Sequence, residues 1–385
     1  MKIFGRILVF ALLLAVLPQG AGAVELEVAG KGVCLMDVAT GTVLYEQNAH
    51  APLAPASVTK VMTMLLIMEA IDDGRIAWTD TVTASEAAAA KGGSQIYLKV
   101  GETMAVSDMV KSIAVSSAND CACAMAEHLY GSETAFVEKM NEKAAQLGME
   151  DTHFVNCTGL DDSPSAAEHK TSAYDVALMS RELLKYHPDI KTYTTIWMDS
   201  VRGGTFGLSN TNKLIRFYPG ATGLKTGFTS SAGYCLSATA QREGMELIAV
   251  VMGAETSTQR NAACKQLLDY GFAAYALVAP ELPEASRVPV KLGRADTVGV
   301  ALETGEGILV EKGKKSGLIT EITLEESLSA PVSQGQILGE LILHTGETTL
   351  AQIPLVAAED VPRLTWGQIY GSVLGKAAMA APGDG

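Results

Sequence analysis

The most constraining feature of this 385-residue chain is a helical segment, residues 57–71, that is apolar on almost every side. Its large apolar side chains are Val58, Val61, Met62, Leu65, Leu66 and Met68, which together cover most of the helix circumference. A helix that is hydrophobic all round has no face to turn toward water. We therefore predict that it lies buried at the centre of a domain, enclosed by the rest of that domain.

The residues around this helix mix strand and helix patterns. Short β-type runs predict an N-terminal hairpin over residues 32–45 and an antiparallel meander over residues 234–252. Further helices are predicted over residues 109–130, 133–147, 171–186 and 259–275, with Thr171 as the candidate N-cap of the third. Strands, then many helices, then strands predict an α+β domain and not a series of βαβ units.

The pattern changes after Pro280. Short β runs separated by Gly, Pro and charged turns predict a small all-β domain, a β-sandwich, that ends near residue 363. The last stretch has one apolar helical face, formed by Trp366, Ile369, Tyr370, Val373 and Leu374. It is too short to span a bilayer and suits a helix that lies at the membrane surface. The alternative for these residues is a flexible tail or a helix packed on the β domain.

The first residues have the pattern of an export signal. Lys2 and Arg6 precede an apolar run over residues 7–17, then Pro18 breaks the run and small residues follow at 21–23. An uncleaved anchor or a buried core helix is the alternative. We therefore expect four segments: a signal peptide 1–23, an α+β domain 24–279, a β domain 280–363 and a tail 364–385. Removing the signal also removes its two positive charges, which changes the net charge from −14 to −16.

The net charge and the cysteine and histidine patterns argue against nucleic acid, disulfide bonds and metal ions. A net charge of −14 argues against nucleic acid, because phosphate binding needs a basic surface. The six cysteines form no CxxC pair, and a chain of this length needs no disulfide stapling, so we expect buried free thiols. The six histidines show no HExxH motif and no paired spacing. We therefore expect no metal site.

Three short motifs occur once each, in a fixed order, in a chain that we expect to be exported. They are Ser57-Val-Thr-Lys60, Ser117-Ala-Asn119 and Lys225-Thr-Gly227. Each motif alone is weak, because Ser57 can be a plain N-cap, the second motif can cap a turn, and the third can be an ordinary strand end. Their joint, ordered occurrence favours a serine-nucleophile site.

The first motif has a physical logic. Residues i and i+3 share a helix face, so the Ser57 hydroxyl and the Lys60 amine can meet. Burial lowers a lysine pKa, and Lys225 as a second cation lowers it further, so a neutral Lys60 can accept the Ser57 proton. We expect Lys225 and the Thr226 hydroxyl to bind a substrate carboxylate. Gly227 should let a substrate backbone approach the strand edge closely.

The second motif supplies hydrogen-bonding groups. We expect the Ser117 hydroxyl to relay a proton to the leaving group, and Asn119 to orient Lys60 or hold a substrate amide. The backbone N–H groups of Ser57 and Phe228 are the candidate donors for an oxyanion. A Ser-His-Asp site is not favoured, because the chain has no G-x-S-x-G and the histidines show no recognisable relation to a serine.

The chain resembles the D-alanyl-D-alanine carboxypeptidases among the type-5 low-molecular-weight penicillin-binding proteins. The three motifs carry this resemblance, together with residues 53–63, 93–98, 156–160, 223–229 and 232–236. It implies a penicillin-binding-protein-like catalytic fold, an antiparallel sheet packed with helices. It also implies removal of the last D-Ala from peptidoglycan stem pentapeptides at the outer face of the bacterial cytoplasmic membrane, without metal or organic cofactor. By the same resemblance Ser57 is the acyl-enzyme nucleophile that β-lactams also acylate, Lys60 is its base, Ser117 and Asn119 complete the second motif, and Lys225 binds the terminal carboxylate.

Three alternative functions use the same scaffold. A class A serine β-lactamase needs a deacylating glutamate, and no E-x-x-L-N run lies between Asn119 and Lys225. A non-catalytic penicillin-recognising sensor has no need to keep Ser57, Lys60 and Lys225. Endopeptidase activity on peptide crosslinks stays open, as do the third stem-peptide residue and the oligomeric state.

Overall fold

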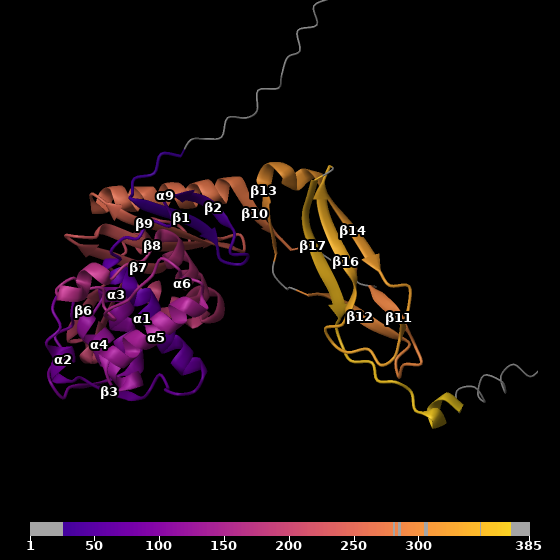
Figure 1. The fold of residues 1–385 in the computed structure, drawn as a ribbon, viewed down its shortest axis with the longest axis horizontal. Coiled ribbons are helices and arrows are strands. Elements are labelled where there is room, and N and C mark those ends of the chain that lie inside the picture. Colours follow the sequence, from indigo (N-terminus) through magenta and orange to yellow (C-terminus); the bar gives the residue numbers. More distant parts are fainter. Residues whose placement is uncertain (1–25, 280–281, 284–285, 304–306, 347, 371–385) are drawn as a thin grey trace, which may run out of the picture.

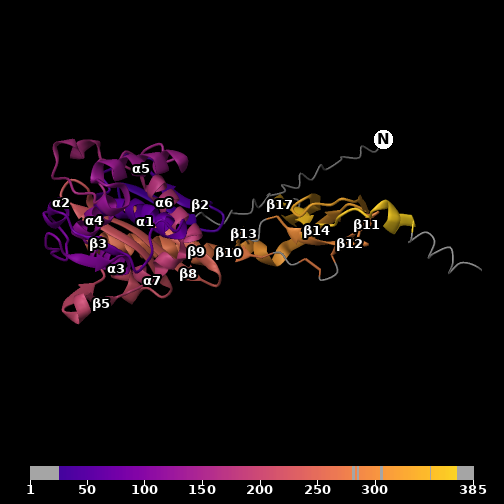
Figure 2. The same ribbon diagram turned by 90° about the horizontal axis from the view of Figure 1, so that it is seen from below.

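A computed structural model describes residues 26–279, 282–283, 286–303, 307–346 and 348–370. The expected signal peptide and residues 371–385 of the expected tail lie outside the described residues. The chain forms a mixed unit of sheet and helices, here the N-terminal unit (residues 26–274), and a β-strand unit, here the C-terminal unit (residues 286–363) (Figure 1). Figure 2 shows the two units side by side as well.

A five-stranded antiparallel sheet forms one layer of the N-terminal unit, in the order β2-β1-β9-β8-β7. The strands are β1 (Gly32–Asp37), β2 (Val43–Gln47), β7 (Ala221–Thr229), β8 (Gly233–Arg242) and β9 (Met245–Ala254). The β1–β2 hairpin and the β8–β9 meander are therefore confirmed. All ten residues of the central strand β9 are buried, because both faces of the sheet are covered.

Alternate side chains of each strand point to two different cores. On β1, Cys34 and Met36 join the core shared with most of the helices, whereas Val33 and Leu35 join the core under α9 (Ser257–Ala274). α6 (Ala173–Tyr186) packs on the opposite face of the sheet from α9. Because both faces of the sheet are buried, the strand sequences are continuous apolar runs and do not alternate between apolar and polar residues.

The predicted central helix is confirmed as α1 (Lys60–Asp72), with ten of its thirteen residues buried. It is enclosed by α6 and by α3 (Val106–Ser116), α4 (Asn119–Tyr130) and α5 (Glu133–Gln146). Its start differs from the prediction, because residues 56–59 form a 3₁₀ turn and the α-helix begins only at Lys60. Ser57 therefore lies in the 3₁₀ turn and not in the helix itself.

Two details of the predicted helices are wrong. The run over residues 109–130 is two helices, because Ser117 adopts a left-handed conformation (φ 64°, ψ 30°) that ends α3 before Asn119 starts α4. The N-cap of α6 is Ser172 and not Thr171, since the Ser172 hydroxyl accepts from the Asp175 N–H at 3.2 Å. Thr171 instead exchanges two backbone hydrogen bonds with Leu53.

Short elements complete the N-terminal unit around the helices. They are β3 (Thr81–Thr83), α2 (Glu86–Ala89), β4 (Thr103–Ala105), α7 (Lys191–Thr194), β5 (Met198–Val201), β6 (Phe206–Ser209) and α8 (Leu214–Phe217). β3 pairs with β4 and β5 pairs with β6, both antiparallel.

The C-terminal unit is built on a six-stranded sheet in the order β14-β16-β17-β12-β11-β15. Its strands are β11 (Arg287–Lys291), β12 (Thr297–Leu302), β14 (Leu318–Leu324), β15 (Leu328–Ser329), β16 (Ile337–Thr345) and β17 (Thr348–Ala357). Two small apolar clusters form its core. Residues 366–370 beyond it are helical, with Trp366 88% exposed. Within the described residues, no helix has the length and apolar character needed to cross a bilayer.

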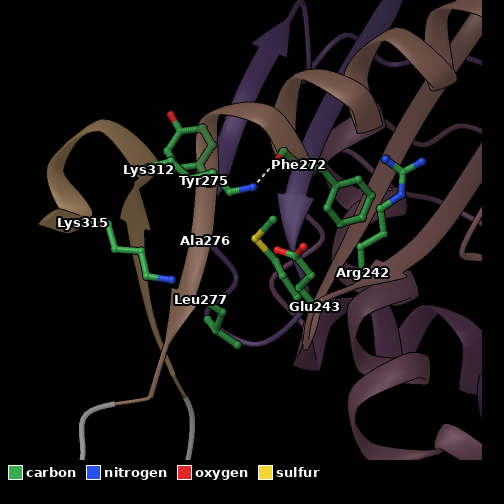
Figure 3. Close-up of a pocket in the computed structure, with 9 residues that line it drawn as sticks. Arg242, Glu243, Phe272, Tyr275, Ala276, Leu277, Lys312 and Lys315 are labelled. Atoms are coloured by element: carbon green, nitrogen blue, oxygen red, sulfur yellow. Dashed lines mark hydrogen bonds between the residues drawn. The ribbon is translucent and has the colours of Figure 1, made fainter.

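A strand pair joins the two units. β10 (Tyr275–Val278) follows α9 directly and pairs with β13 (Ile308–Glu311). The Lys312 ammonium donates to the Phe272 carbonyl at 2.7 Å, beside a cavity of about 270 Å³ that residues of both units line (Figure 3). This cavity is lined by none of the residues of the three motifs.

Candidate active site

The first motif forms a direct contact at the start of the central helix. Lys60 is fully buried, and its Nζ donates to the Ser57 Oγ at 3.0 Å and to the Thr158 carbonyl at 2.8 Å. The 3₁₀ turn, like an α-helix turn, lets residues 57 and 60 face the same side. The expected meeting of serine hydroxyl and lysine amine is therefore present in the structure.

The surroundings of Lys60 favour its neutral form. Burial lowers the pKa of Lys60 to about 7, and Cys157 and the Asp120 carboxylate oppose only part of that shift. A large fraction of Lys60 is therefore unprotonated near neutral pH and can accept a proton. The hydroxyl of Ser57, at hydrogen-bond distance, is the group placed to give it up.

The backbone around Ser57 is tightly packed. Ala56 has a φ of +48°, which is uncommon for a residue with a side chain. A Cβ at Gly227 would lie 2.8 Å from the Pro55 oxygen and 3.0 Å from the Ser57 nitrogen. A Cβ at Gly159 would lie only 1.8 Å from the Ala56 oxygen. The sequence predicted that Gly227 admits a substrate backbone; the structure adds that it lets β7 approach the serine turn itself.

The third motif brings a second buried lysine to the site. Lys225 is 1% exposed, and its Nζ donates to the Thr226 carbonyl at 2.8 Å. Burial lowers the pKa of Lys225 well below its usual range, and the charges of Lys60 and Arg260 lower it further. The two lysines are therefore close enough for the charge of Lys60 to disfavour that of Lys225. The expected reverse effect is not seen, because the pKa of Lys60 is lowered by burial and not by Lys225.

Thr226 connects the third motif to the second. Its hydroxyl donates to the Thr211 Oγ1 at 2.7 Å, and the Thr211 N–H donates to the Val115 carbonyl near the end of α3. Thr211 is a residue that no sequence motif indicated. The Phe228 side chain is 53% exposed and packs on Tyr234 with ring centroids 4.3 Å apart.

The second motif presents two unpaired polar atoms. The Ser117 Oγ and the Asn119 Oδ1 are buried and have no hydrogen-bond partner among the described residues. Such orphaned groups are costly, and they are expected where a ligand completes them. The Asn119 amide nitrogen donates to the Gly92 carbonyl at 2.7 Å, so it holds the 91–98 loop. No hydrogen bond of the described residues joins it to Lys60, which was one of its two expected roles.

The carbonyl that binds Lys60 comes from a loop whose geometry sequence reasoning did not anticipate. The Asn156 Oδ1 accepts from the N–H groups of Thr158 and Gly159, at 3.1 Å and 2.6 Å. The Glu133 carboxylate accepts from the Cys157 N–H at 3.2 Å and pairs with Lys91. These contacts fix the turn that directs the Thr158 carbonyl at Lys60. The Asn-Cys-Thr-Gly-Leu run carried a signal of resemblance but not this role.

A histidine also lies close to the nucleophile turn, although no pattern in the sequence indicated it. The His169 Nε2 is 2.8 Å from the Thr59 Oγ1, which donates to the Ala56 carbonyl. It does not contact the Ser57 hydroxyl in any hydrogen bond of the described residues, so it does not form a Ser-His pair. Thr59 and His169 are 110 residues apart, so no local sequence pattern could indicate this contact.

The cysteines and the candidate metal ligands are both subjects of the sequence predictions. All six cysteines are free and buried, which confirms the expected buried thiols. Across the described residues, no group of three or more His, Cys, Asp and Glu side chains could hold a metal ion.

Comparisons with family models agree with the motifs. A model described as D-alanyl-D-alanine carboxypeptidase matches residues 19–256, and one described as the C-terminal domain of penicillin-binding protein 5 matches residues 283–363.

Two curated relatives match nearly the whole chain. The chain is 44% identical over 351 residues to the D-alanyl-D-alanine carboxypeptidase DacF of Bacillus subtilis, covering 90% of this chain and 89% of that protein. It is 32% identical over 359 residues to DacA of Escherichia coli, covering 90% of this chain and 87% of that protein.

Solved structures extend the similarity to the fold. Penicillin-binding protein 5 of Haemophilus influenzae matches with a TM-score of 0.75 at 30% identity, covering 89% of this chain and all of that chain. Penicillin-binding protein D2 of Listeria monocytogenes in its ampicillin-bound form matches with a TM-score of 0.59 at 32% identity, covering 64% of this chain and 99% of that chain.

Proposed function

Because the chain belongs to the D-alanyl-D-alanine carboxypeptidase family, we propose that Ser57, Lys60 and Lys225 carry out its reaction. The protein is a serine-type D-Ala-D-Ala carboxypeptidase, and its α+β fold is of the penicillin-binding-protein type followed by an all-β domain. Its substrates are peptidoglycan stem peptides, and β-lactams are its covalent inhibitors. The observation that carries the residue assignment is the 3.0 Å contact between the Ser57 Oγ and a fully buried Lys60.

The first half of the reaction is acylation. Neutral Lys60 accepts the proton of the Ser57 hydroxyl while Ser57 Oγ attacks the carbonyl carbon between the two D-alanines. The C–N bond then breaks, the leaving D-alanine takes a proton through the Ser117 hydroxyl, and an ester to Ser57 remains. The unpaired and buried Ser117 Oγ supports this relay role.

Charged and polar groups hold the substrate during this step. Lys225 and the Thr226 hydroxyl bind the terminal carboxylate, and Asn119 holds a substrate amide through its unpaired Oδ1. The N–H groups of Ser57 and Phe228 receive the oxyanion, an assignment that the close approach of Gly227 to Ser57 supports. Water then hydrolyses the ester in the second half of the reaction.

The nearby carboxylates favour a carboxypeptidase over a rapid β-lactamase. The Glu133 carboxylate forms an ion pair with Lys91 and accepts a hydrogen bond from the Cys157 N–H. The Asp120 carboxylate accepts from the N–H groups of Ile96 and Leu98. Neither carboxylate is hydrogen-bonded to Ser57 or Lys60 in the described residues. A β-lactam ester on Ser57 is therefore expected to be long-lived, because neither of these two carboxylates is placed to activate water at Ser57.

Two measurements on the full chain test the residue assignment. Release of D-Ala from a Lys-D-Ala-D-Ala peptide should be readily detected, and fluorescent penicillin should label the protein covalently for many minutes. Ser57→Ala should abolish both while leaving the thermal unfolding curve unchanged. Residual labelling of Ser57→Ala would show that the nucleophile lies elsewhere, and rapid turnover of penicillin would favour the β-lactamase alternative.

We also propose the finer organisation and location of the chain. Residues 1–23 direct export and are removed, residues 24–279 are the catalytic domain, residues 280–363 are the β-sandwich, and residues 364–385 attach the enzyme to the outer face of the cytoplasmic membrane. The exposed Trp366 and Tyr370 support attachment at a membrane surface. Deleting residues 364–385 should release the enzyme from membranes without lowering D-Ala release from a soluble peptide. A truncated enzyme that still sediments with membranes would place the anchor elsewhere.

A further inference from the structure

The turn that carries Ser57 has a backbone conformation that needs outside support. Ala56 directly precedes Ser57 and has a φ of +48°, a region that residues with a side chain seldom occupy. Such a conformation persists only where neighbouring groups hold it. The carbonyl of Ala56 is therefore the place to look for the groups that do so.

The Thr59 hydroxyl is one of them. Thr59 is fully buried, and its Oγ1 lies 2.8 Å from the Ala56 carbonyl oxygen. A carbonyl oxygen can only accept, so the single hydroxyl proton of Thr59 is used in this bond. The oxygen of the same hydroxyl can then only accept from its second neighbour, the His169 Nε2 at 2.8 Å. The His169 Nε2 must consequently carry a proton.

The other nitrogen of His169 demands the same tautomer. Its Nδ1 lies 3.1 Å from the Val155 N–H, which can only donate, so Nδ1 must be unprotonated. Two independent partners thus require a neutral ring with the proton on Nε2. Burial keeps the ring neutral by lowering the pKa of His169 to about 4, and the positive charges of His153 and Lys60 add to that effect.

His169 is also held firmly in place. It is 4% exposed, and the adjacent Lys170 exchanges two backbone hydrogen bonds with His153. Thr171 exchanges two more with Leu53, four residues before Ser57. The segment that carries the imidazole is therefore paired to the same stretch of chain whose conformation the imidazole supports.

We propose that Thr59 and His169 are positioning residues for the nucleophile, acting through the chain His169 Nε2–H to Thr59 Oγ1–H to the Ala56 carbonyl. Neither residue touches the reacting atoms. The chain fixes the turn that sets Ser57 Oγ 3.0 Å from Lys60 Nζ, the distance across which the proton moves during acylation. This inference rests on the proposed function, in which Ser57 is the nucleophile and Lys60 its base.

Substitutions at Thr59 test the hydroxyl directly. Thr59→Val keeps the shape and removes the hydroxyl, whereas Thr59→Ser keeps the hydroxyl. With a β-lactam and the full chain, we expect Thr59→Val to lower the acylation rate constant at saturation roughly 10- to 100-fold, because small displacements of a nucleophile have effects of this size. The non-covalent binding constant should change less than about twofold, and Thr59→Ser should acylate within about threefold of the unmodified protein.

A matched control separates positioning from general loss of stability. Thr194 is 1% exposed, and its hydroxyl also donates to a backbone carbonyl, that of Thr222 at 2.7 Å, without contacting residues 56–60. Thr194→Val should lower the unfolding temperature about as much as Thr59→Val does, while its acylation rate constant stays unchanged. Equal losses of acylation in the two variants would overturn the proposal.

Substitutions at His169 test whether the two residues act as one chain. His169→Leu removes the N–H, and His169→Gln restores a donor toward Thr59 but not the acceptor for Val155. We expect a loss of acylation in His169→Leu that His169→Gln partly restores. The double variant Thr59→Val/His169→Leu should acylate no more slowly than Thr59→Val alone, because the chain is already broken.

The results that contradict the proposal differ from those that contradict the proposed function. Additive losses in the double variant, or Thr59→Ser as slow as Thr59→Val, would overturn the positioning chain while leaving Ser57 as the nucleophile. If the unmodified protein is not acylated at Ser57, the proposed function itself fails, before any Thr59 variant is compared.

Discussion

The two units of the molecule differ in what they bury. In the N-terminal unit the buried side chains include charged and polar ones spread from Asp37 to Arg260, among them Lys60 and Lys225 at 1% exposure or less. In the described residues of the C-terminal unit, every buried side chain is apolar. The described part of the C-terminal unit therefore forms its core without buried polar side chains.

The difference shows that groups needed for the reaction lower the stability of the N-terminal unit. Burying an amine disfavours its charged form, and burying a hydroxyl without a partner leaves a hydrogen bond unmade. The N-terminal unit carries both, in Lys60 and in the Ser117 hydroxyl, and it encloses them with a core built on both faces of its sheet. The C-terminal unit has only small apolar clusters and carries no such cost. Activity and stability should therefore respond in opposite ways to changes at the buried lysine.

The largest effect is expected from Lys60→Met, which fills the same space without an amine. Acylation by β-lactam should fall at least about 10³-fold, because Ser57 loses its base. Stability should rise. The folded-state pKa of Lys60 is about 7 and the unfolded value is about 10.4, so the folded protein binds fewer protons in between. Burial of Lys60 therefore destabilises the folded state by at most about 5 kcal/mol. This destabilisation is fully present below pH 7 and decreases as the pH rises toward 10.4.

Urea unfolding at pH 7 and at pH 10 measures this linkage. Lys60→Met should be more stable than the unmodified protein at pH 7, and the two should converge at pH 10. Lys291→Met, at an exposed position on β11 of the C-terminal unit, is the matched control and should change neither stability nor acylation. A Lys60→Met variant that is less stable at pH 7 would contradict the account of buried charge given for the N-terminal unit.

The second effect is on the pH dependence of acylation in the unmodified protein. Only neutral Lys60 can accept the Ser57 proton, and the pKa of Lys60 is lowered to about 7. The acylation rate should therefore fall about 50-fold between pH 7 and pH 5, approach a 10-fold fall for each pH unit below pH 6, and level off above pH 8. Stopped-flow acylation across this range checks the prediction. A flat profile from pH 5 to pH 8 would mean that Lys60 is not the base.

A third, smaller effect comes from two glycines with the same φ angle, one in each unit. Gly159 and Gly335 both have a φ of +81°, so alanine is strained at both positions by about 1–2 kcal/mol. At Gly159 the added Cβ would also lie 1.8 Å from the Ala56 oxygen, whereas at Gly335 it meets open space. Gly159→Ala should slow acylation roughly 10-fold through the displaced Ser57 turn, and Gly335→Ala should leave it unchanged. Equal acylation by the two variants would show that the turn tolerates displacement.

Local sequence patterns predicted much of the fold and the core of the site. The central helix, the β1–β2 hairpin and the β8–β9 meander depend on periodicity within one segment, and all three are present. The contact of Ser57 with Lys60 also depends on spacing within one turn. These features could be read from the sequence because the residues that determine them are neighbours along the chain.

The features that the sequence did not predict depend on backbone conformation or on distant residues. The apolar pattern continues through residues 109–130, so it hides the left-handed Ser117 that divides the run and exposes the second motif. Thr171 has the residue type of an N-cap, but its backbone is taken by Leu53. The Thr158 carbonyl and His169 reach the site across 98 and 110 residues of sequence. A single sequence contains no signal for such pairings.

The smallest effect on activity is expected from a large change in the C-terminal unit. Leu341 lies on β16 and is fully buried in one of the two apolar clusters of that unit. Leu341→Ala should destabilise the C-terminal unit by about 2–5 kcal/mol. Acylation should nevertheless stay within about twofold of normal at temperatures where the N-terminal unit is folded, since all the motif residues belong to that unit. Calorimetry and acylation on the same samples check both halves of this expectation. A tenfold loss of acylation would show that loss of structure in the C-terminal unit reaches the N-terminal unit through the β10–β13 pair and the Lys312–Phe272 contact. The C-terminal unit would then help to stabilise the unit that holds the buried lysines.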